Sequence, residues 1–109
     1  MKDERAIDAF AALAQTSRMA IFRLLVRSGP EGLKVGEISQ RPGIVSSTLS
    51  GHLSVLKRAG LLTATRHQRE IIYAANLVIV NDLIGYLLED CCDGRLENCS
   101  EILSLLETG

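Results

Sequence analysis

The sequence predicts a mainly α-helical fold with one small β-hairpin, in a single domain over residues 1–109. A length of 109 residues fits one domain. Apolar residues recur at helical spacing along most of the chain, whereas residues 61–74 contain two short β-type runs. Only 4% of the residues are aromatic, so the core must be built from Leu, Ile, Val and Ala.

The first part of the chain predicts three helices separated by turn residues. An amphipathic helix covers about Glu4–Ala14, and Thr16 or Ser17 caps a second helix. That second helix ends before the stop signal Gly29-Pro30. Two apolar residues at helical spacing predict a third, short helix within Leu33–Gln40.

The rest of the chain predicts a longer helix, a hairpin and further helices, which brings the total to about five or six. The longer helix opens at Ser46 and is followed by Gly60 as its C′ residue. Two β-type runs over 61–66 and 70–74 form the hairpin, with a polar tip over 67–69. Val78–Leu88 predicts a strongly apolar helix that Asp93-Gly94 can end, and residues 102–106 predict a last short one.

The net charge of −1 seems to argue against a nucleic-acid partner, but the charge is unevenly distributed. Residues 1–75 carry a balance of +5, and residues 76–109 carry −6. Residues 41–69 hold five basic side chains and no acidic one. We therefore expect a basic binding face joined to an acidic end with a different task.

Targeting signals and catalytic motifs are not evident in the sequence. Five of the first eight residues are charged, and no apolar signal segment follows them. No run of about 18 apolar residues predicts a membrane span. We expect a cytoplasmic protein. No Gly-rich phosphate loop, supported Ser-His-Asp set or Cys-x-x-Cys motif is present, so no enzyme is predicted.

The order of short helix, turn, polar-start helix and basic hairpin predicts a winged helix-turn-helix that binds double-stranded DNA. Small polar residues at the start of the helix that opens at Ser46 suit base edges and phosphates, and Lys and Arg neutralise phosphate charge. The plainer alternative is a capped helix with a solvated charged face. The predicted DNA-binding residues are Ser46, Ser47, Thr48, Ser50, His52, Lys57, Arg58, Arg66, His67 and Arg69.

Two segments resemble the ArsR/SmtB family of metal-responsive repressors. Residues 10–25 (FAALAQTSRMAIFRLL) are similar to the family's opening signature, and residues 47–62 (STLSGHLSVLKRAGLL) to its recognition helix. With the wing, the resemblance covers roughly residues 7–92. It implies a dimeric repressor that releases DNA when a metal or metalloid binds.

The sequence departs from the family pattern at several positions. Val45 stands where members often have a capping Ser, and Gly51 replaces a common His, so we assign no base contact to Gly51. The founding arsenic sensors carry Cys-Val-Cys before the recognition helix. The matching residues here are Lys34, Val35 and Gly36, which cannot supply that thiolate site.

Three cysteines, Cys91, Cys92 and Cys99, lie in a single stretch of nine residues in the acidic part of the chain. An odd, clustered set in a reducing compartment favours a ligand or redox site over a disulfide framework. Along one helix, Cys91 and Cys99 would lie about 12 Å apart, so the chain must fold back for their sulfurs to share an ion. The arrangement resembles arsenite-responsive ArsR proteins whose sensor site lies in the C-terminal segment, here about residues 89–109.

Several ligands remain open for these thiols. Three soft sulfurs suit trivalent arsenic or antimony, zinc would need a fourth ligand such as Asp90, and an organic arsenical needs only two thiols. In a redox switch, Cys91 or Cys92 would instead pair with Cys99. A buried apolar role for Cys91 is the plain alternative.

We expect a homodimer, because the apolar residues of Val78–Leu88 cover more of the helix than one core needs. The sequence thus predicts a dimeric operator-binding repressor that arsenite As(III), or Sb(III), releases through Cys91, Cys92 and Cys99. The predicted dimer contacts are Ile7, Phe10, Ile79, Leu83, Tyr86 and Leu87.

Overall fold

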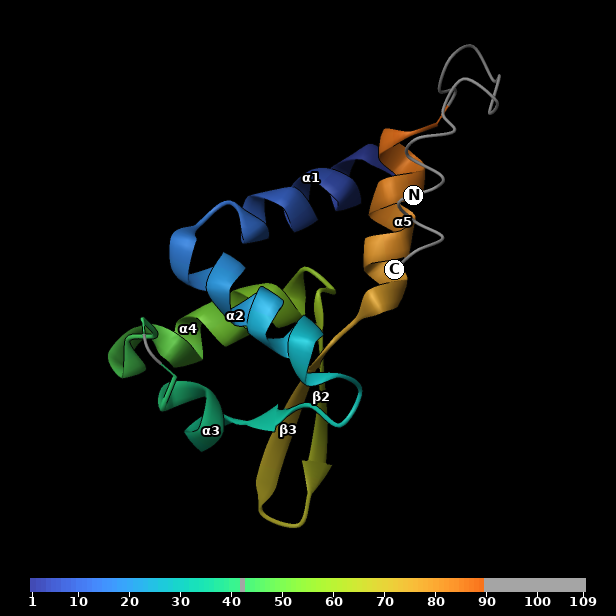
Figure 1. Cartoon of the computed structure of the whole chain (residues 1–109). Helices are drawn as coiled ribbons and strands as arrows, with labels where there is room; N and C mark the ends of the chain where they lie inside the picture. Colours follow the sequence, from blue (N-terminus) through green and yellow to red (C-terminus); the bar gives the residue numbers. More distant parts are fainter. Residues whose placement is uncertain (42, 90–109) are drawn as a thin grey trace.

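The computed structural model describes residues 1–41 and 43–89. Within them it contains five helices and a three-stranded antiparallel sheet with the order β1-β3-β2 (Figure 1). The β2–β3 hairpin projects from the helices as a wing. The elements are α1 (Asp3–Leu13), α2 (Thr16–Ser28), β1 (Leu33–Lys34), α3 (Val35–Ser39), α4 (Ser46–Arg58), β2 (Leu62–His67), β3 (Glu70–Ala75) and α5 (Leu77–Leu87). The predicted fold class is confirmed.

The core lies where α2 packs across α4 and where α1 and α5 close the same apolar space (Figure 1). Leu49, Leu53 and Leu56 form the inner stripe of α4, and each is at most 2% exposed. Three alanines of α1 are also buried, which allows this helix to pack closely. The core therefore fixes one face of α4 and leaves the opposite face to solvent.

The short helix predicted within Leu33–Gln40 is α3, but Leu33 and Lys34 before it form strand β1, which the sequence did not predict. They pair with Tyr73 and Ile72 at the free edge of β3. This pairing satisfies backbone groups that a longer α3 would have used internally. Gly32 precedes the strand with a φ of +69°, and a Cβ there would clash with the Tyr73 carbonyl oxygen.

The N-terminus of α2 differs from the prediction that Thr16 or Ser17 caps it. Gln15 is the N-cap residue, and its Oε1 accepts a hydrogen bond of 2.8 Å from the Arg18 backbone N–H. The longer amide side chain does the work expected of a Ser or Thr oxygen. The predicted end of α2 before Gly29 is confirmed.

The wing hairpin closes through a two-residue turn, since His67 belongs to β2 and pairs with Glu70. Gln68 therefore occupies the first turn position with a φ of +59°. Hairpin turns usually place Gly, Asn or Asp at such positions. The predicted three-residue tip is one residue too long because the sequence lacks that signal.

The last described helix, α5, starts one residue earlier than predicted, because Asn76 caps it. The Asn76 Oδ1 accepts from the Val78 N–H at 3.2 Å, and its Nδ2 donates to the Gly60 carbonyl at 2.9 Å. These bonds fix α5 to the turn that follows α4. The helix ends at Leu87, so the prediction that Asp93-Gly94 ends it is wrong. The helix predicted over 102–106 lies outside the described residues.

No single helix in the described ranges is long and apolar enough to cross a membrane. The pair formed by α1 and α2 passes on length and composition taken together, but the chain bends by 98° between the two helices.

Candidate nucleic-acid interface

The outward face of α4 carries small polar side chains opposite its buried leucines. At 100° per residue, Ser47, Gly51, Ser54 and Arg58 fall on one strip directly away from that buried stripe. All four are exposed, and a Cβ added at Gly51 would meet nothing within 4 Å. This strip is the surface that a major groove would contact.

The first turn of α4 is free of a side-chain cap, because the N-cap residue is Val45. Amide groups that lack a capping side chain can donate to phosphate oxygens at a helix N-terminus. Thr48 differs from its serine neighbours, since its Oγ1 donates back to the Val45 carbonyl at 3.2 Å. Ser46 and Ser47 are thus the better placed of the predicted contacts.

The predicted DNA-binding residues lie on two adjoining parts of the molecule, α4 and the wing. All are exposed except His52, which is half-buried on the flank of α4. Arg58 lies about 18 Å along the helix axis from Ser46. Arg58 therefore lies at the far end of the α4 surface. It also lines a groove shared with α1.

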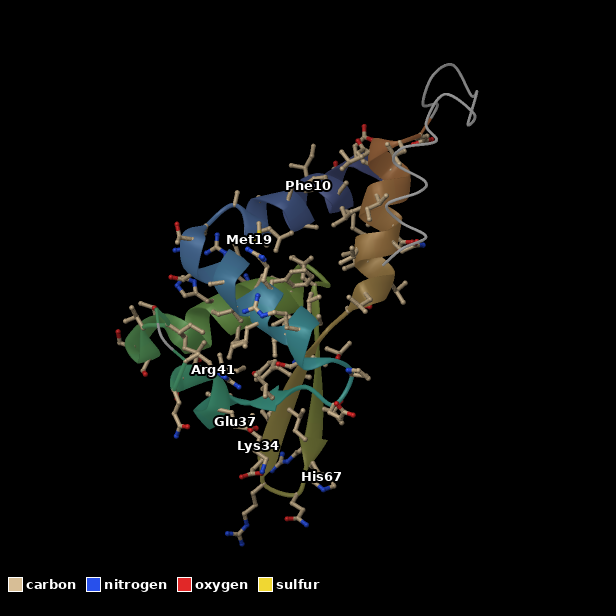
Figure 2. All side chains as sticks on the ribbon, viewed as in Figure 1. Phe10, Met19, Lys34, Glu37, Arg41 and His67 are labelled. Carbon is tan, nitrogen blue, oxygen red and sulfur yellow. The ribbon has the colours of Figure 1, made fainter. Side chains whose placement is uncertain are left out.

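The wing carries its basic side chains near the turn, where His67 extends from the end of β2 (Figure 2). The Arg66 Nε donates to the Gln68 carbonyl at 3.3 Å, which supports the turn, and Arg69 is exposed beside it. Positive side chains on a protruding hairpin suit contacts to the phosphate backbone. These residues stay predictions as DNA contacts.

The turn end of the wing holds an ion pair that the sequence did not predict. The Lys34 Nζ lies 2.7 Å from Glu70 Oε2, and both side chains are about half exposed. The hydrogen bond and charge of Glu70 raise the pKa of Lys34 above its usual value. The backbone N–H of Lys34 also donates to Glu37, and Figure 2 shows these two side chains beside the hairpin. The contact ties α3 to the wing.

A basic groove of about 410 Å³ lies between α2 and the turn that precedes α4. Arg23 and Arg27 of α2 line it together with Arg41, which is labelled in Figure 2. None of the three was predicted from the sequence as a site residue. Their four-residue spacing on α2 and the acid-free segment that begins at Arg41 were the signals available.

The predicted dimer residues divide into buried, exposed and half-buried groups. Ile79 and Leu83 are 1% and 5% exposed and pack inside the chain's own core, so they are corrected from partner contacts to core residues. Ile7 and Leu87 are 61% and 62% exposed, and Val78, which was not singled out, is 69% exposed. Phe10 and Tyr86 are half-buried. An apolar repeat alone cannot separate these two roles.

The predicted thiol site lies outside the described residues, because Cys91, Cys92 and Cys99 fall within 90–109. Among residues 1–41 and 43–89, no group of three His, Cys, Asp or Glu side chains could hold a metal ion. The described part of the chain therefore offers DNA-binding geometry, while the sensor stays a prediction.

A helix-turn-helix with an exposed polar helix strip and a basic wing defines the class of winged helix-turn-helix DNA-binding domains. Comparison with known proteins agrees. A helix-turn-helix domain family model matches residues 13–64. A helix-turn-helix-type regulator of Bacillus subtilis, YceK, is 44% identical over 66 residues, which cover 61% of this chain and 64% of that protein.

Two solved structures extend the similarity over most of the chain. A helix-turn-helix-type transcriptional regulator of Mycobacterium tuberculosis is 32% identical with a TM-score of 0.57, over 77% of this chain and 89% of that one. An ArsR-like regulator from Rhodococcus has a TM-score of 0.71 at 22% identity, over 94% and 92%. The chain belongs to the helix-turn-helix-type transcriptional regulators, and its fold is that of ArsR-like regulators.

Proposed function

We propose that the chain is a homodimeric transcriptional repressor that binds operator DNA and releases it when trivalent arsenic binds three cysteines. The observation that carries the DNA part is the exposed strip of Ser47, Gly51 and Ser54, held outward by the buried leucines of α4. The strip lets the helix backbone approach base edges closely, because no side chain on it is larger than Ser before Arg58.

The dimer part rests on the exposed apolar side chains of α1 and α5. Ile7, Val78 and Leu87 are each more than 60% exposed, which is costly for a lone domain in water. A second copy that covers them would place two α4 helices in successive major grooves of a palindromic site. Repression then follows from occupancy of the operator, as the ArsR/SmtB resemblance implies.

The sensor part rests on chain connectivity and thiol chemistry. Cys91 and Cys92 follow the end of α5 within five residues, so an ion bound there acts directly on the proposed dimer helix. Three thiolates suit As(III) or Sb(III). Release requires the ion to favour the dimer geometry that does not bind DNA, since tight binding to both states would shift nothing.

The test is fluorescence anisotropy of a labelled duplex from the chain's own upstream region, titrated with protein and then with arsenite. We expect wild type to release the duplex, and Cys91→Ser, Cys92→Ser and Cys99→Ser to bind it normally but resist release. Equal release from all four proteins would refute the sensor assignment. Release by oxidant alone, reversed by reductant, would replace it with a thiol–disulfide switch.

An organic trivalent arsenical distinguishes a two-thiol site from a three-thiol site. Phenylarsine oxide binds only two thiols. If two of the three cysteines form its site, the serine variant that keeps those two should still release DNA when the compound is added. Loss of the response to arsenite in every variant, with phenylarsine oxide still active in one, would support the three-thiol arsenite site.

A further inference from the structure

A groove of about 620 Å³ lies between α1 and the C-terminal end of α4, on the side where α2 begins. Three arginines from three different helices line it: Arg5 of α1, Arg18 of α2 and Arg58 of α4. Its volume falls within the roughly 300–1,000 Å³ of small-molecule sites. Arg58 is also a predicted DNA contact, but Arg5 and Arg18 belong neither to the predicted DNA contacts nor to the cysteine segment.

One of the three guanidinium groups is held in place by the backbone. The Arg18 Nε donates to the Ala12 carbonyl at 2.6 Å, at the C-terminal end of α1. In residues 1–41 and 43–89, Lys34 and Glu70 form the one ion pair with an N–O distance below 4 Å. Among these residues, therefore, neither Arg5 nor Arg58 has a carboxylate partner. Asp8 also lines the groove, which leaves a net positive charge of two.

The walls between these charges are formed by apolar residues with small side chains. Ala11, Val55, Ala59 and Gly60 line the groove. A Cβ at Gly60 would lie 3.6 Å from Arg5 Nη2, so the absence of a side chain at Gly60 keeps space beside that guanidinium. An apolar surface with a few converging polar groups is the usual composition of a ligand pocket.

We propose that this groove binds a small organic oxyanion, whose charged group pairs with Arg5 and Arg58 and whose apolar body covers Ala11 and Val55. Guanidinium groups bind carboxylate and related oxyanions through paired N–H donors. Arg18 contributes positive charge from a fixed position. The test of this site uses no DNA, so a failure of this proposal can be distinguished from a failure of the proposed DNA binding.

The probe is 8-anilinonaphthalene-1-sulfonate, which combines an anion with an apolar body, added to the full chain without DNA. We expect saturable fluorescence enhancement at one probe per chain, and displacement by sodium benzoate but not by sodium chloride at equal ionic strength. Ala11→Leu fills the groove without changing charge and should weaken probe binding about tenfold or more. Arg5→Gln should weaken it by a similar factor.

The matched control is Ala20→Leu, which changes an exposed helical alanine outside this groove in the same way. It should bind the probe as wild type does, and circular dichroism should show native helix content in all variants. Equal probe binding in Ala11→Leu and Ala20→Leu would overturn the proposal. Displacement by chloride as effective as by benzoate would also overturn it, because the apolar walls would then have no role.

Discussion

The phenol of Tyr86 donates a hydrogen bond of 2.7 Å to the carboxylate of Asp3, across 83 residues of sequence. The bond joins the last turn of α5 to the first turn of α1. These two helices carry the exposed apolar side chains of the proposed dimer surface. The contact therefore fixes the relative position of the two helices through which a signal from the C-terminal segment would pass.

This hydrogen bond predicts how Tyr86 titrates. Donation to Asp3, with smaller contributions from desolvation and charge, raises the pKa of Tyr86 above its ordinary value of 10.0. A raised pKa means that the bond stabilises the fold fully below pH 10.0, and that this is lost as the pH rises through the folded-state pKa. In a Tyr73→Phe background, tyrosinate absorbance should show Tyr86 ionising at a lower pH once Asp3→Ala is added. Asp8→Ala is the control, and an unchanged midpoint with Asp3→Ala would refute the assignment.

Gly51 and Gly60 should respond in opposite directions to the same substitution. Gly51→Ala should raise the free energy of unfolding by about 1 kcal/mol, because the added methyl meets open space in a helix interior. Gly60→Ala should lower it by about 1–2 kcal/mol, because φ is +83° and the Cβ lies 3.2 Å from Ile79 Cδ1. Urea denaturation measures both. A loss of stability in Gly51→Ala would mean that its outward placement is wrong.

Leu53 should contribute strongly to the anchoring of α4. Leu53→Ala removes a side chain that is 2% exposed and should cost about 2–5 kcal/mol of unfolding free energy. Ser54→Ala, one residue along and exposed, should stay within about 0.5 kcal/mol of wild type. Similar costs for the two variants in urea denaturation would contradict the observed orientation of the helix.

The wing should contribute to DNA affinity through phosphate charge. Arg66→Gln should reduce the slope of log K against log salt concentration by about 1, with little change in sequence preference. Arg5→Gln, which removes the same charge from α1, is the control and should leave the slope unchanged. An unchanged slope in Arg66→Gln would remove this side chain from the interface.

The parts of the fold that local signals define were predictable from the sequence. The bounds of α4 follow from its polar start, its leucine spacing and the Gly60 that ends it, and the structure confirms them. Strand β1 was not predictable, because two residues become a strand only when the edge of β3 is available. Gln15 capped α2 where Thr16 was expected, since either side chain can supply the oxygen.

The candidate site was predictable in type but not in extent. The outward serines and the basic wing follow from residue order. Ser54 lies seven residues after Ser47 and was missed, although that spacing puts both on one strip. Arg23 and Arg27 come from a helix outside the motif, so only three-dimensional packing places them beside Arg41.

The central claim is that the outward strip of α4 contacts DNA, and one matched pair of variants tests it most directly. Ser47→Glu and Thr16→Glu each add a carboxylate to the first turn of a helix, and both positions are exposed. By anisotropy with the upstream duplex, Ser47→Glu should weaken binding at least about tenfold, because the carboxylate would face phosphates. Thr16→Glu should bind as wild type does. Equal affinities for Ser47→Glu and wild type would contradict the account.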